Sequence, residues 1–338
     1  MPTTGSQCYL CDLPIHFDTY KGCSHQCQYC FAKKFKDLSD IKPNEGLQAL
    51  KNFVEGHRNK TTSWCDWNIP LHIGGMSDPL QPVELTKGIT YECLKYLAET
   101  QYPFVISTKG KLLGNRKYID ILSKCNCVVQ VSLVCESFDK LELGCPTFKE
   151  RLEIIKKISP YVKRVIVRIQ PYMHEVYNEV FNNLSLFKSA GVYGVIIEGI
   201  KLQKKKKGLV KVGGDFTYPY ELIRSDFLKL RDEAHRLGLK IYAGENRIRA
   251  LGDSLTCCGV DDIEGFKPNK FNLNHLVNGD KQKPTKAMTQ KDTAMAFKAL
   301  YQDTISTKVL KEKSFAGKML EYYKENTKKI NTVLGKEH

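Results

Sequence analysis

The sequence lacks any long apolar run. No stretch of about 18 apolar residues occurs within its 338 residues, so we expect no membrane-spanning helix. The first residues, Met1-Pro2-Thr3-Thr4, contain no apolar segment of the kind that a signal peptide needs. Internal repeats and low-complexity tracts are lacking as well. These absences argue against a membrane or secreted protein and leave a globular chain, longer than most single domains but within the range of one α/β barrel.

An even set of cysteines, which a disulfide framework would require, is also missing. The chain has 13 cysteines, an odd and high number. Without a signal for secretion, this number argues against paired disulfides. We expect a reducing, cytoplasmic location in which some cysteines bind metal and others are simply buried.

Acidic residues are scarce relative to basic ones. The chain has 37 Asp and Glu against 52 Lys and Arg, a formal net charge of +15. The last 58 residues alone hold 13 Lys and six acidic residues. Such an excess favours nucleic acid, an anionic surface or a phosphorylated substrate as the partner, and a merely solvated basic surface is the alternative. The run Lys204–Lys207 in a predicted loop is either a solvated turn or a tip that contacts phosphates.

Apolar strands alternate with amphipathic helices along most of the chain. The predicted strands are residues 14–22, 69–73, 104–106, 127–134, 164–169, 194–197 and 239–243. The predicted helices are residues 43–56, 84–99, 115–124, 148–159, 175–190 and 223–237. This order implies parallel strands with right-handed crossovers. We predict an α/β fold, a partial or nearly complete (β/α)6-7 TIM-type barrel over 1–250, with a Cys-Cys segment and a basic helical C-terminal extension over 251–338 packed on it.

Three cysteines, Cys23, Cys27 and Cys30, lie within one short loop, with Gly22 before it and Tyr29 inside it. The spacing suits three thiolates on three corners of one iron–sulfur cube. Clusters that only transfer electrons normally have four protein ligands, so three leave one iron open to another molecule. A zinc site with His25 as a further ligand is the alternative.

A second set of cysteines lies at the two ends of the predicted barrel. Cys8 and Cys11 form a Cys-x2-Cys pair near the N-terminus, and Cys257 and Cys258 are adjacent after the last predicted strand. If the four meet across the barrel mouth, they would bind an auxiliary four-iron cluster or a zinc ion. Two unrelated reduced pairs are the alternative.

Polar and glycine residues follow several predicted strands, at the end of the barrel where catalytic groups converge. Gly74 and Gly75 allow close approach of a ligand to the backbone, Ser77 and Asp78 offer oxygens, and Lys109 suits a carboxylate. Ser132 lies in an otherwise apolar strand, where its hydroxyl needs a partner. Turn residues and satisfied core hydroxyls are the alternative. Substrate recognition is expected from Arg168, Gln170, Tyr172, His174, Glu198, Glu245 and Arg247, which could instead form ordinary salt bridges and caps.

The loop from Cys23 to Cys30 resembles the Cys-x3-Cys-x-aromatic-Cys motif of the radical S-adenosylmethionine superfamily. The resemblance implies a 4Fe-4S cluster whose open iron is chelated by the methionine moiety of S-adenosylmethionine. It also implies an α/β barrel fold.

Three segments narrow the resemblance to the spore photoproduct lyase-like branch: Asp18 to Ala32, Ser77-Asp78-Pro79-Leu80-Gln81-Pro82-Val83-Glu84, and Ser107-Thr108-Lys109. The likeness covers roughly the first 135 residues. It implies Ser77, Lys109 and Ser132 as contacts to the methionine end of the cofactor and Tyr29 as packing near the adenine. Gly75 lies where the lyase has a hydrogen-donating cysteine, which argues against pyrimidine-dimer reversal. Cys135 is a further candidate hydrogen donor, or simply a small buried residue.

We therefore expect an enzyme that reductively cleaves S-adenosylmethionine to a 5′-deoxyadenosyl radical and abstracts hydrogen from a substrate. An electron donor such as flavodoxin or ferredoxin would supply the electron. The basic charge and the resemblance favour nucleic acid or a nucleotide-derived compound as substrate. Two alternatives are radical modification of a peptide or small metabolite, and a non-catalytic zinc or iron–sulfur module that binds nucleic acid.

Overall fold

One mixed sheet organises the computed structural model, which describes residues 1–4, 11–62, 65, 67–212, 215–270, 272 and 274–275. The eight strands, in pairing order, are β1 (Thr3–Thr4), β2 (Ile15–Phe17), β5 (Leu71–Ile73), β6 (Phe104–Thr108), β7 (Cys127–Ser132), β8 (Arg164–Tyr172), β9 (Gly194–Gly199) and β12 (Lys240–Ala243). From β2 to β12 every neighbouring pair is parallel, and only β1 runs antiparallel to β2. Within the described residues no pairing joins β12 back to β1, so the sheet is a partial barrel.

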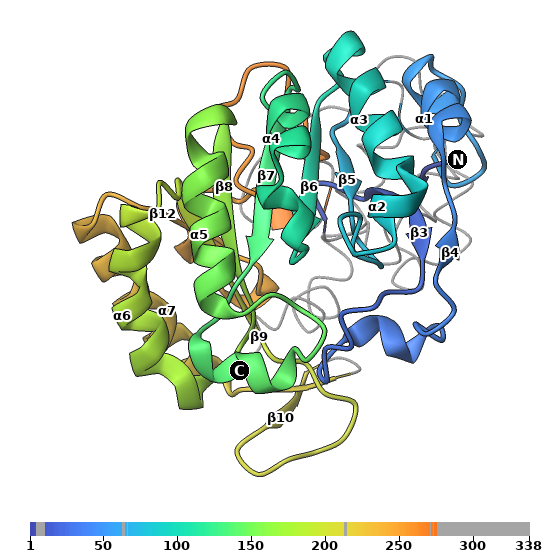
Figure 1. Cartoon of the computed structure of the whole chain (residues 1–338). Coiled ribbons are helices and arrows are strands. Elements are labelled where there is room, and N and C mark those ends of the chain that lie inside the picture. The colour runs from blue at the N-terminus through green and yellow to red at the C-terminus, as the bar shows by residue number, and fades with distance from the viewer. Residues whose placement is uncertain are drawn as a thin grey trace, which may run out of the picture.

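Helices connect successive strands and cover the outer face of the curved sheet (Figure 1). They are α1 (Leu47–Val54), α2 (Glu84–Lys87), α3 (Ile89–Thr100), α4 (Arg116–Leu122), α5 (Phe148–Ile158), α6 (Tyr177–Ser189) and α7 (Tyr220–Arg236). Short 3-10 helices include η2 (Phe31–Lys34), η3 (Lys111–Gly114), η4 (Glu136–Leu141), η5 (Ser159–Tyr161), η6 (His174–Val176) and η7 (Asn246–Leu251). Two small antiparallel ribbons, β3 (Tyr20–Lys21) with β4 (Lys42–Pro43) and β10 (Val210–Val212) with β11 (Asp215–Thr217), complete the described elements.

Alternate residues of each strand pack on opposite faces, as the two-residue period requires. Outward residues such as Ile106, Val129 and Val167 join the large core beneath the helices. Inward residues Val105, Val128, Ile166 and Ile196 pack instead against Val260 and Phe266 in a second core. A segment near the described C-terminal end therefore fills part of the inside of the sheet.

This segment, residues 257–266, lies at the end of the sheet where the strands begin. Arg164, the first residue of β8, donates to the carbonyl oxygens of Gly259 at 3.1 Å and Asp261 at 2.6 Å. The opposite end of the sheet, where the parallel strands finish, carries the loop from Cys23 to Cys30. We call that end the rim.

The predicted α/β barrel is confirmed, and each of its seven predicted strands is present. The helix predicted from residue 43 begins only at Leu47, because Pro43 pairs with Tyr20 in a ribbon. The helix predicted over 84–99 is broken at Gly88, whose φ of 64° is left-handed. The ribbon of β10 and β11 was not predicted.

The predicted basic helical extension lies outside the described residues. Residues 251–270 are described, and part of this segment packs inside the sheet as noted above. The division into 1–250 and 251–338 stays a prediction. Among the described residues, no helix combines the length and the apolar character that crossing a membrane demands.

Candidate active site at the rim of the barrel

The three predicted ligands, Cys23, Cys27 and Cys30, lie in a loop held by backbone hydrogen bonds. Cys23 N donates to Leu38 O at 2.8 Å, and Cys30 N donates to Cys27 O at 3.2 Å. None of the three forms a disulfide; Cys27 is buried, and the other two are partly exposed. The loop thus presents three free thiols from one short segment, next to the ends of β5 and β6.

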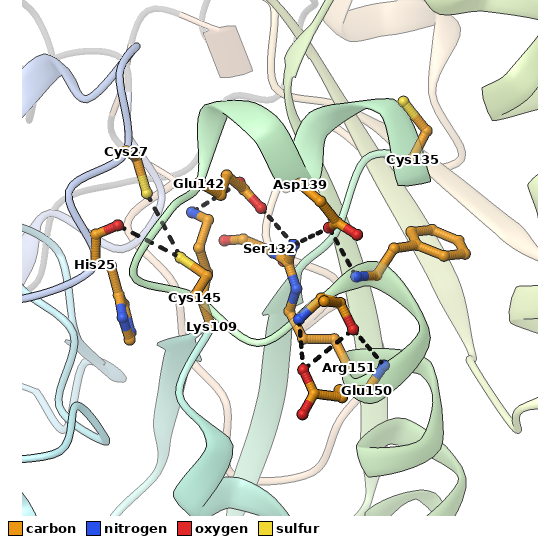
Figure 2. Close-up of polar contacts among 12 residues, drawn as sticks. His25, Cys27, Lys109, Ser132, Cys135, Asp139, Glu142, Cys145, Glu150 and Arg151 are labelled. Carbon is orange, nitrogen blue, oxygen red and sulfur yellow. Dashed lines mark hydrogen bonds and ion pairs between the residues drawn. The ribbon is translucent and has the colours of Figure 1, made fainter.

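A second loop, residues 142–145 between η4 and α5, packs directly on the cysteine loop (Figure 2). Gly144 N donates to His25 O at 3.0 Å, and the His25 ring bonds Gly144 O, also at 3.0 Å. The Sγ atoms of Cys145 and Cys27 lie 3.8 Å apart. The 142–145 loop therefore brings a fourth thiol to the three predicted from the sequence.

Glu142 connects this loop to the ends of β6 and β7. Its buried carboxylate accepts hydrogen bonds from the Tyr29 hydroxyl and from Arg151 of α5, and Lys109 Nζ lies 3.9 Å away. Arg151 also donates to Ser132 O at 2.7 Å. Lys109, Tyr29 and Ser132, predicted separately from the sequence, are thus gathered around one carboxylate that was not predicted.

The electrostatic surroundings favour a thiolate at Cys27 and a cation at Lys109. A hydrogen bond from the Cys145 thiol, and to a lesser degree Lys109, lower the pKa of Cys27 to about 6 despite burial. Burial alone would lower the pKa of Lys109, but the carboxylate of Glu142 and the nearby thiols raise it. In contrast, burial and the charge of Asp78 raise the pKa of Cys23 to about 11.

Asp78 is buried and joins the cysteine loop to the end of β6. It pairs with His25 Nε2 at 3.0 Å and accepts hydrogen bonds from Thr108 Oγ1 at 2.7 Å and Lys109 N at 2.6 Å. Burial would raise the pKa of Asp78, but His25 and the other donors lower it, and Asp78 in turn raises the pKa of His25. Both oxygens of the predicted ligand Asp78 thus already hold protein groups.

The neighbouring predicted residues lie close to the backbone of other strands. Ser77 Oγ donates to Tyr20 O at 2.6 Å. A Cβ at Gly74 would lie 2.3 Å from Ser107 O, and one at Gly75 would lie 2.8 Å from His16 Nδ1. Only glycine lets this turn approach β2 and β6 so closely.

The predicted substrate residues fall into two groups. Arg168 and Gln170 hydrogen-bond to each other on β8, and the pairs Glu198 with Lys201 and Glu245 with Arg247 lie at 2.7 and 2.9 Å. The second group, Tyr172 and His174, contacts helix α7 instead. Tyr172, fully buried in the large core, and His174 both bond to Asp226 of α7, each at 2.7 Å.

Cys135 lies apart from the cysteine loop. Its Sγ is 3.2 Å from Ser137 Oγ, and burial raises the pKa of its thiol to about 12. The thiol close to the predicted ligands is Cys145. Cys145 could have been identified from its position after the fourth predicted strand, because the loop that follows this strand must lie at the rim.

The donor set fits an iron–sulfur cluster, because three free thiols from one loop lie beside a fixed cation, with Cys27 poised as a thiolate. Among the residues that the structure describes, no group of three or more His, Cys, Asp or Glu side chains is arranged to hold a metal ion. The assignment of Cys23, Cys27 and Cys30 as ligands thus depends on the chemistry of the donors and stays a prediction.

The second cysteine set lies at the end of the sheet opposite the rim. Cys11 precedes β2, and its thiol interacts electrostatically with Cys257. The Sγ atoms of Cys257 and Cys258 are 3.6 Å apart, and Cys258 packs in the inner core near the start of the strands. Cys8 lies outside the described residues. Cys11 and Cys257 thus come near one another, but on the side of the sheet away from the barrel mouth, because the 257–266 segment folds back under the sheet. The auxiliary metal site stays a prediction.

No protein-family model matches the chain. It is 27% identical over 214 residues to uncharacterised proteins of Mycobacterium bovis and Mycobacterium tuberculosis, an alignment that covers 58% of this chain. The chain spans 62% of the length of these curated relatives.

Among solved structures, the chain is similar to a spore photoproduct lyase double mutant with bound AdoMet and dinucleoside spore photoproduct. The TM-score is 0.54 at 14% identity, over 68% of this chain and 76% of that one. At this identity the likeness concerns the fold. The chain therefore shares the partial α/β barrel fold of that lyase.

Proposed function

We propose that the protein is a radical S-adenosylmethionine enzyme acting on nucleic acid or a nucleotide-derived compound. The observation that carries the proposal is the cysteine loop with Cys23, Cys27 and Cys30, held against Lys109 by the 142–145 loop. When bound, a 4Fe-4S cluster reduced by a donor such as flavodoxin or ferredoxin supplies reductive cleavage of S-adenosylmethionine to a 5′-deoxyadenosyl radical. The chain's own residues must bind and orient the reactants and exclude water.

Each rim residue has a definite part in this proposal. Protonated Lys109 is suited to the carboxylate of the methionine moiety, because it remains a cation in a buried setting. Ser77 and Ser132 are proposed as neighbouring contacts, and the Tyr29 ring as packing for the adenine. Gly74 and Gly75 are proposed to lie along the cofactor, in a turn that packs closely against β2 and β6. The close packing around Glu142 limits the access of water to this region.

Anaerobic reconstitution with iron and sulfide, followed by a chemical reductant and S-adenosylmethionine, tests the proposal directly. We expect the wild-type protein to form 5′-deoxyadenosine and the Cys27→Ala variant to form none above background. Cys93→Ala, which removes a buried thiol of α3 that is not part of the cysteine loop, is the matched control and should retain product formation. A cluster-loaded wild-type protein that forms no 5′-deoxyadenosine would contradict the proposal, and a protein containing only zinc would favour the non-catalytic alternative.

The iron content of the same preparation also bears on the second cysteine set. We propose that Cys11, Cys257 and Cys258 bind an auxiliary cluster or a zinc ion, because Cys257 is poised as a thiolate. Its pKa is lowered to about 6, first by a hydrogen bond with Cys258 and also by buried Arg249. Iron beyond one cluster, or bound zinc, that is lost in Cys257→Ser/Cys258→Ser would support this. If the metal content of Cys257→Ser/Cys258→Ser equals that of the wild-type protein, these residues bind no metal and are a reduced cysteine pair.

The position of the lysine run favours a polyanionic substrate over a peptide or small metabolite. Lys204–Lys207 are all exposed, in the loop between β9 and the ribbon of β10 and β11. This ribbon is tied to the segment after the cysteine loop by the ion pair of Lys34 with Asp215 at 3.1 Å. In Figure 1 the ribbon projects at the end of the barrel where the strands finish. The four cations thus belong to a loop next to a ribbon at the same end of the barrel as the candidate active site.

We expect these lysines to contribute to the salt dependence of nucleic-acid binding. Replacing all four of Lys204–Lys207 by Gln should make the slope of log K against log salt less steep by about 3, because each phosphate contact releases counterions. Fluorescence anisotropy of a labelled single-stranded oligonucleotide over a series of salt concentrations measures the slope. A slope equal to that of the wild-type protein would remove this loop from the binding surface, and salt-independent wild-type binding would favour the peptide or metabolite alternative.

A further inference from the structure

A row of polar side chains crosses the inner face of the sheet, above the apolar inner core. It runs from His16 on β2 through His72 on β5, Ser107 on β6 and Gln130 on β7 to Arg168 on β8. The rings of His16 and His72 meet edge to face, with centroids 5.3 Å apart. His72 Nε2 lies 2.8 Å from Ser107 Oγ. Both Ser107 and Arg168 reach the same oxygen of Gln130, at 2.9 and 2.8 Å.

The orientation of the Gln130 amide is fixed from both sides. Its nitrogen donates to Cys258 O at 2.8 Å, in the segment beneath the sheet. Its oxygen must therefore face Arg168, which can only donate. The same oxygen accepts from Ser107, since an amide oxygen has no hydrogen to give.

This orientation decides the tautomer of His72. The single hydrogen of the Ser107 hydroxyl is used on Gln130, so toward His72 the hydroxyl can only accept. His72 must therefore carry its proton on Nε2, which leaves Nδ1 as a bare acceptor. No hydrogen bond to this Nδ1, or to either ring nitrogen of His16, occurs within the described part of the chain. Both rings are only partly buried.

The surroundings of both histidines favour the neutral imidazole. Burial, and then the charge of Arg168, lower the pKa of His16 to about 4. Burial, His16 and Arg168 together lower the pKa of His72 well below its ordinary value. Neutral imidazoles beside a guanidinium do not suit an ammonium group, which the guanidinium would repel. They also give an anion no countercharge of their own, so the open acceptors suit an uncharged N–H donor.

We propose that His16 and His72 form a recognition site for the ring N–H of a nucleobase. The site lies directly below the Gly74-Gly75 turn, since a Cβ on Gly75 would lie 2.8 Å from His16 Nδ1. A base bound there is adjacent to the rim where the proposed radical chemistry takes place. Gln130 and Ser107 act as positioning residues that set the tautomer of His72. The choice of a nucleobase as the ligand rests on the proposed function. The presence of open acceptor nitrogens on His16 and His72 does not depend on it.

The test compares two strands of equal charge on the reconstituted, S-adenosylmethionine-loaded protein without reductant. One is a labelled oligothymidylate, and the other is the same strand built from N3-methylthymidine, which lacks the ring N–H. We expect the wild-type protein to bind the methylated strand about 10- to 100-fold more weakly, because the acceptors lose their donor. Both strands have the same phosphates, so the contribution of phosphate contacts to binding cancels in the ratio of the two affinities.

His72→Gln separates recognition from folding. The glutamine amide can still donate to Ser107 but has no counterpart of Nδ1, so the discrimination should fall to within about twofold of unity. Ser107→Ala should also lower the ratio of the two affinities, because His72 is then free to carry its proton on Nδ1. Glu99→Gln, at an exposed position of α3, is the matched control and should keep the wild-type ratio.

The inference would be overturned by equal affinity of the wild-type protein for both strands, or by full discrimination in His72→Gln. Failure to bind either strand, in a protein that still forms 5′-deoxyadenosine, would also overturn it and would point to a peptide N–H as the donor recognised. Failure of the proposed chemistry is separate. It would appear as a lack of 5′-deoxyadenosine in a protein that still discriminates between the strands.

Discussion

The Gly144→Ala variant is expected to lose most of the iron that the wild-type protein retains after anaerobic reconstitution. A Cβ at this position would lie 2.3 Å from Ser24 O and 2.9 Å from the Cα atom of His25. Both are backbone atoms of the cysteine loop, so no side-chain rotation can relieve the clash. The loop must move away from the 142–145 loop, which separates Cys27 from Cys145 and disturbs the spacing of all three predicted ligands.

Iron analysis and the visible absorbance of the cluster measure this effect, and thermal unfolding measures its cost to the fold. We expect the free energy of unfolding of the cluster-free protein to fall by about 1–3 kcal/mol, as for other overpacked sites. Gly46→Ala is the matched control, since a Cβ there meets nothing within 4 Å. Normal iron content in Gly144→Ala would show that the 142–145 loop does not hold the cysteine loop in place.

Loss of Arg151 is expected to have the largest effect on stability among the residues of the site. Arg151 and Glu142 form an ion pair in which both side chains are 1% exposed. Arg151→Met leaves the Glu142 carboxylate buried with only the Tyr29 hydroxyl and a distant Lys109. Breaking one half of a buried pair in this way costs about 3–5 kcal/mol, much of it from the unpaired charge. Urea denaturation at neutral pH measures the change.

Two comparisons make this prediction specific. Arg116→Met removes an arginine whose ion pair with Asp120, at 2.7 Å, is exposed on both sides, and it should change stability by no more than about 0.5 kcal/mol. Adding Glu142→Gln to Arg151→Met should recover part of the loss, because the buried charge is then gone. A double variant less stable than Arg151→Met alone would mean that Glu142 is stabilised chiefly by Lys109 and Tyr29.

The barrel could be predicted because each strand and helix has a recognisable hydrophobic pattern in its own segment of the sequence. Runs such as Cys127–Val134 and stripes such as that of 148–159 have the right period and length, and parallel connectivity follows from their alternation. The boundaries were less certain where tertiary pairing prevailed over local preference. Pro43 suits the first turn of a helix, yet it is used in the ribbon with Tyr20.

The site was predictable only where its residues come from one segment or one motif. Cys23, Cys27 and Cys30 share a loop, whereas Glu142 and Cys145 reach that loop through the fold alone. Arg151 occupies an inward position of an amphipathic helix, where a sequence pattern predicts an apolar residue. A buried cation at such a position can be recognised only with its partner in view.

The tautomer of His72 could not be predicted from the sequence either. The position of its proton depends on a chain of hydrogen bonds through Ser107 and Gln130 to the backbone of Cys258. No local pattern records such a chain, because its links come from three strands and a distant segment. The same holds for the placement of the second cysteine set, which depends on the path of residues 257–266 beneath the sheet.

That path has a consequence for the order in which the protein matures. Gln130 and Cys258 are 128 positions apart in the chain, and the carbonyl of Cys258 is one of the two groups that orient the Gln130 amide, the other being Arg168. During synthesis, the strands that carry His16, His72, Ser107 and Gln130 all leave the ribosome well before residue 258. Until the segment arrives, the Gln130 amide is oriented from its oxygen side alone, by Arg168. The hydrogen bond that holds the Gln130 nitrogen is thus completed only when the late segment docks, after the strands that carry the row have already been made.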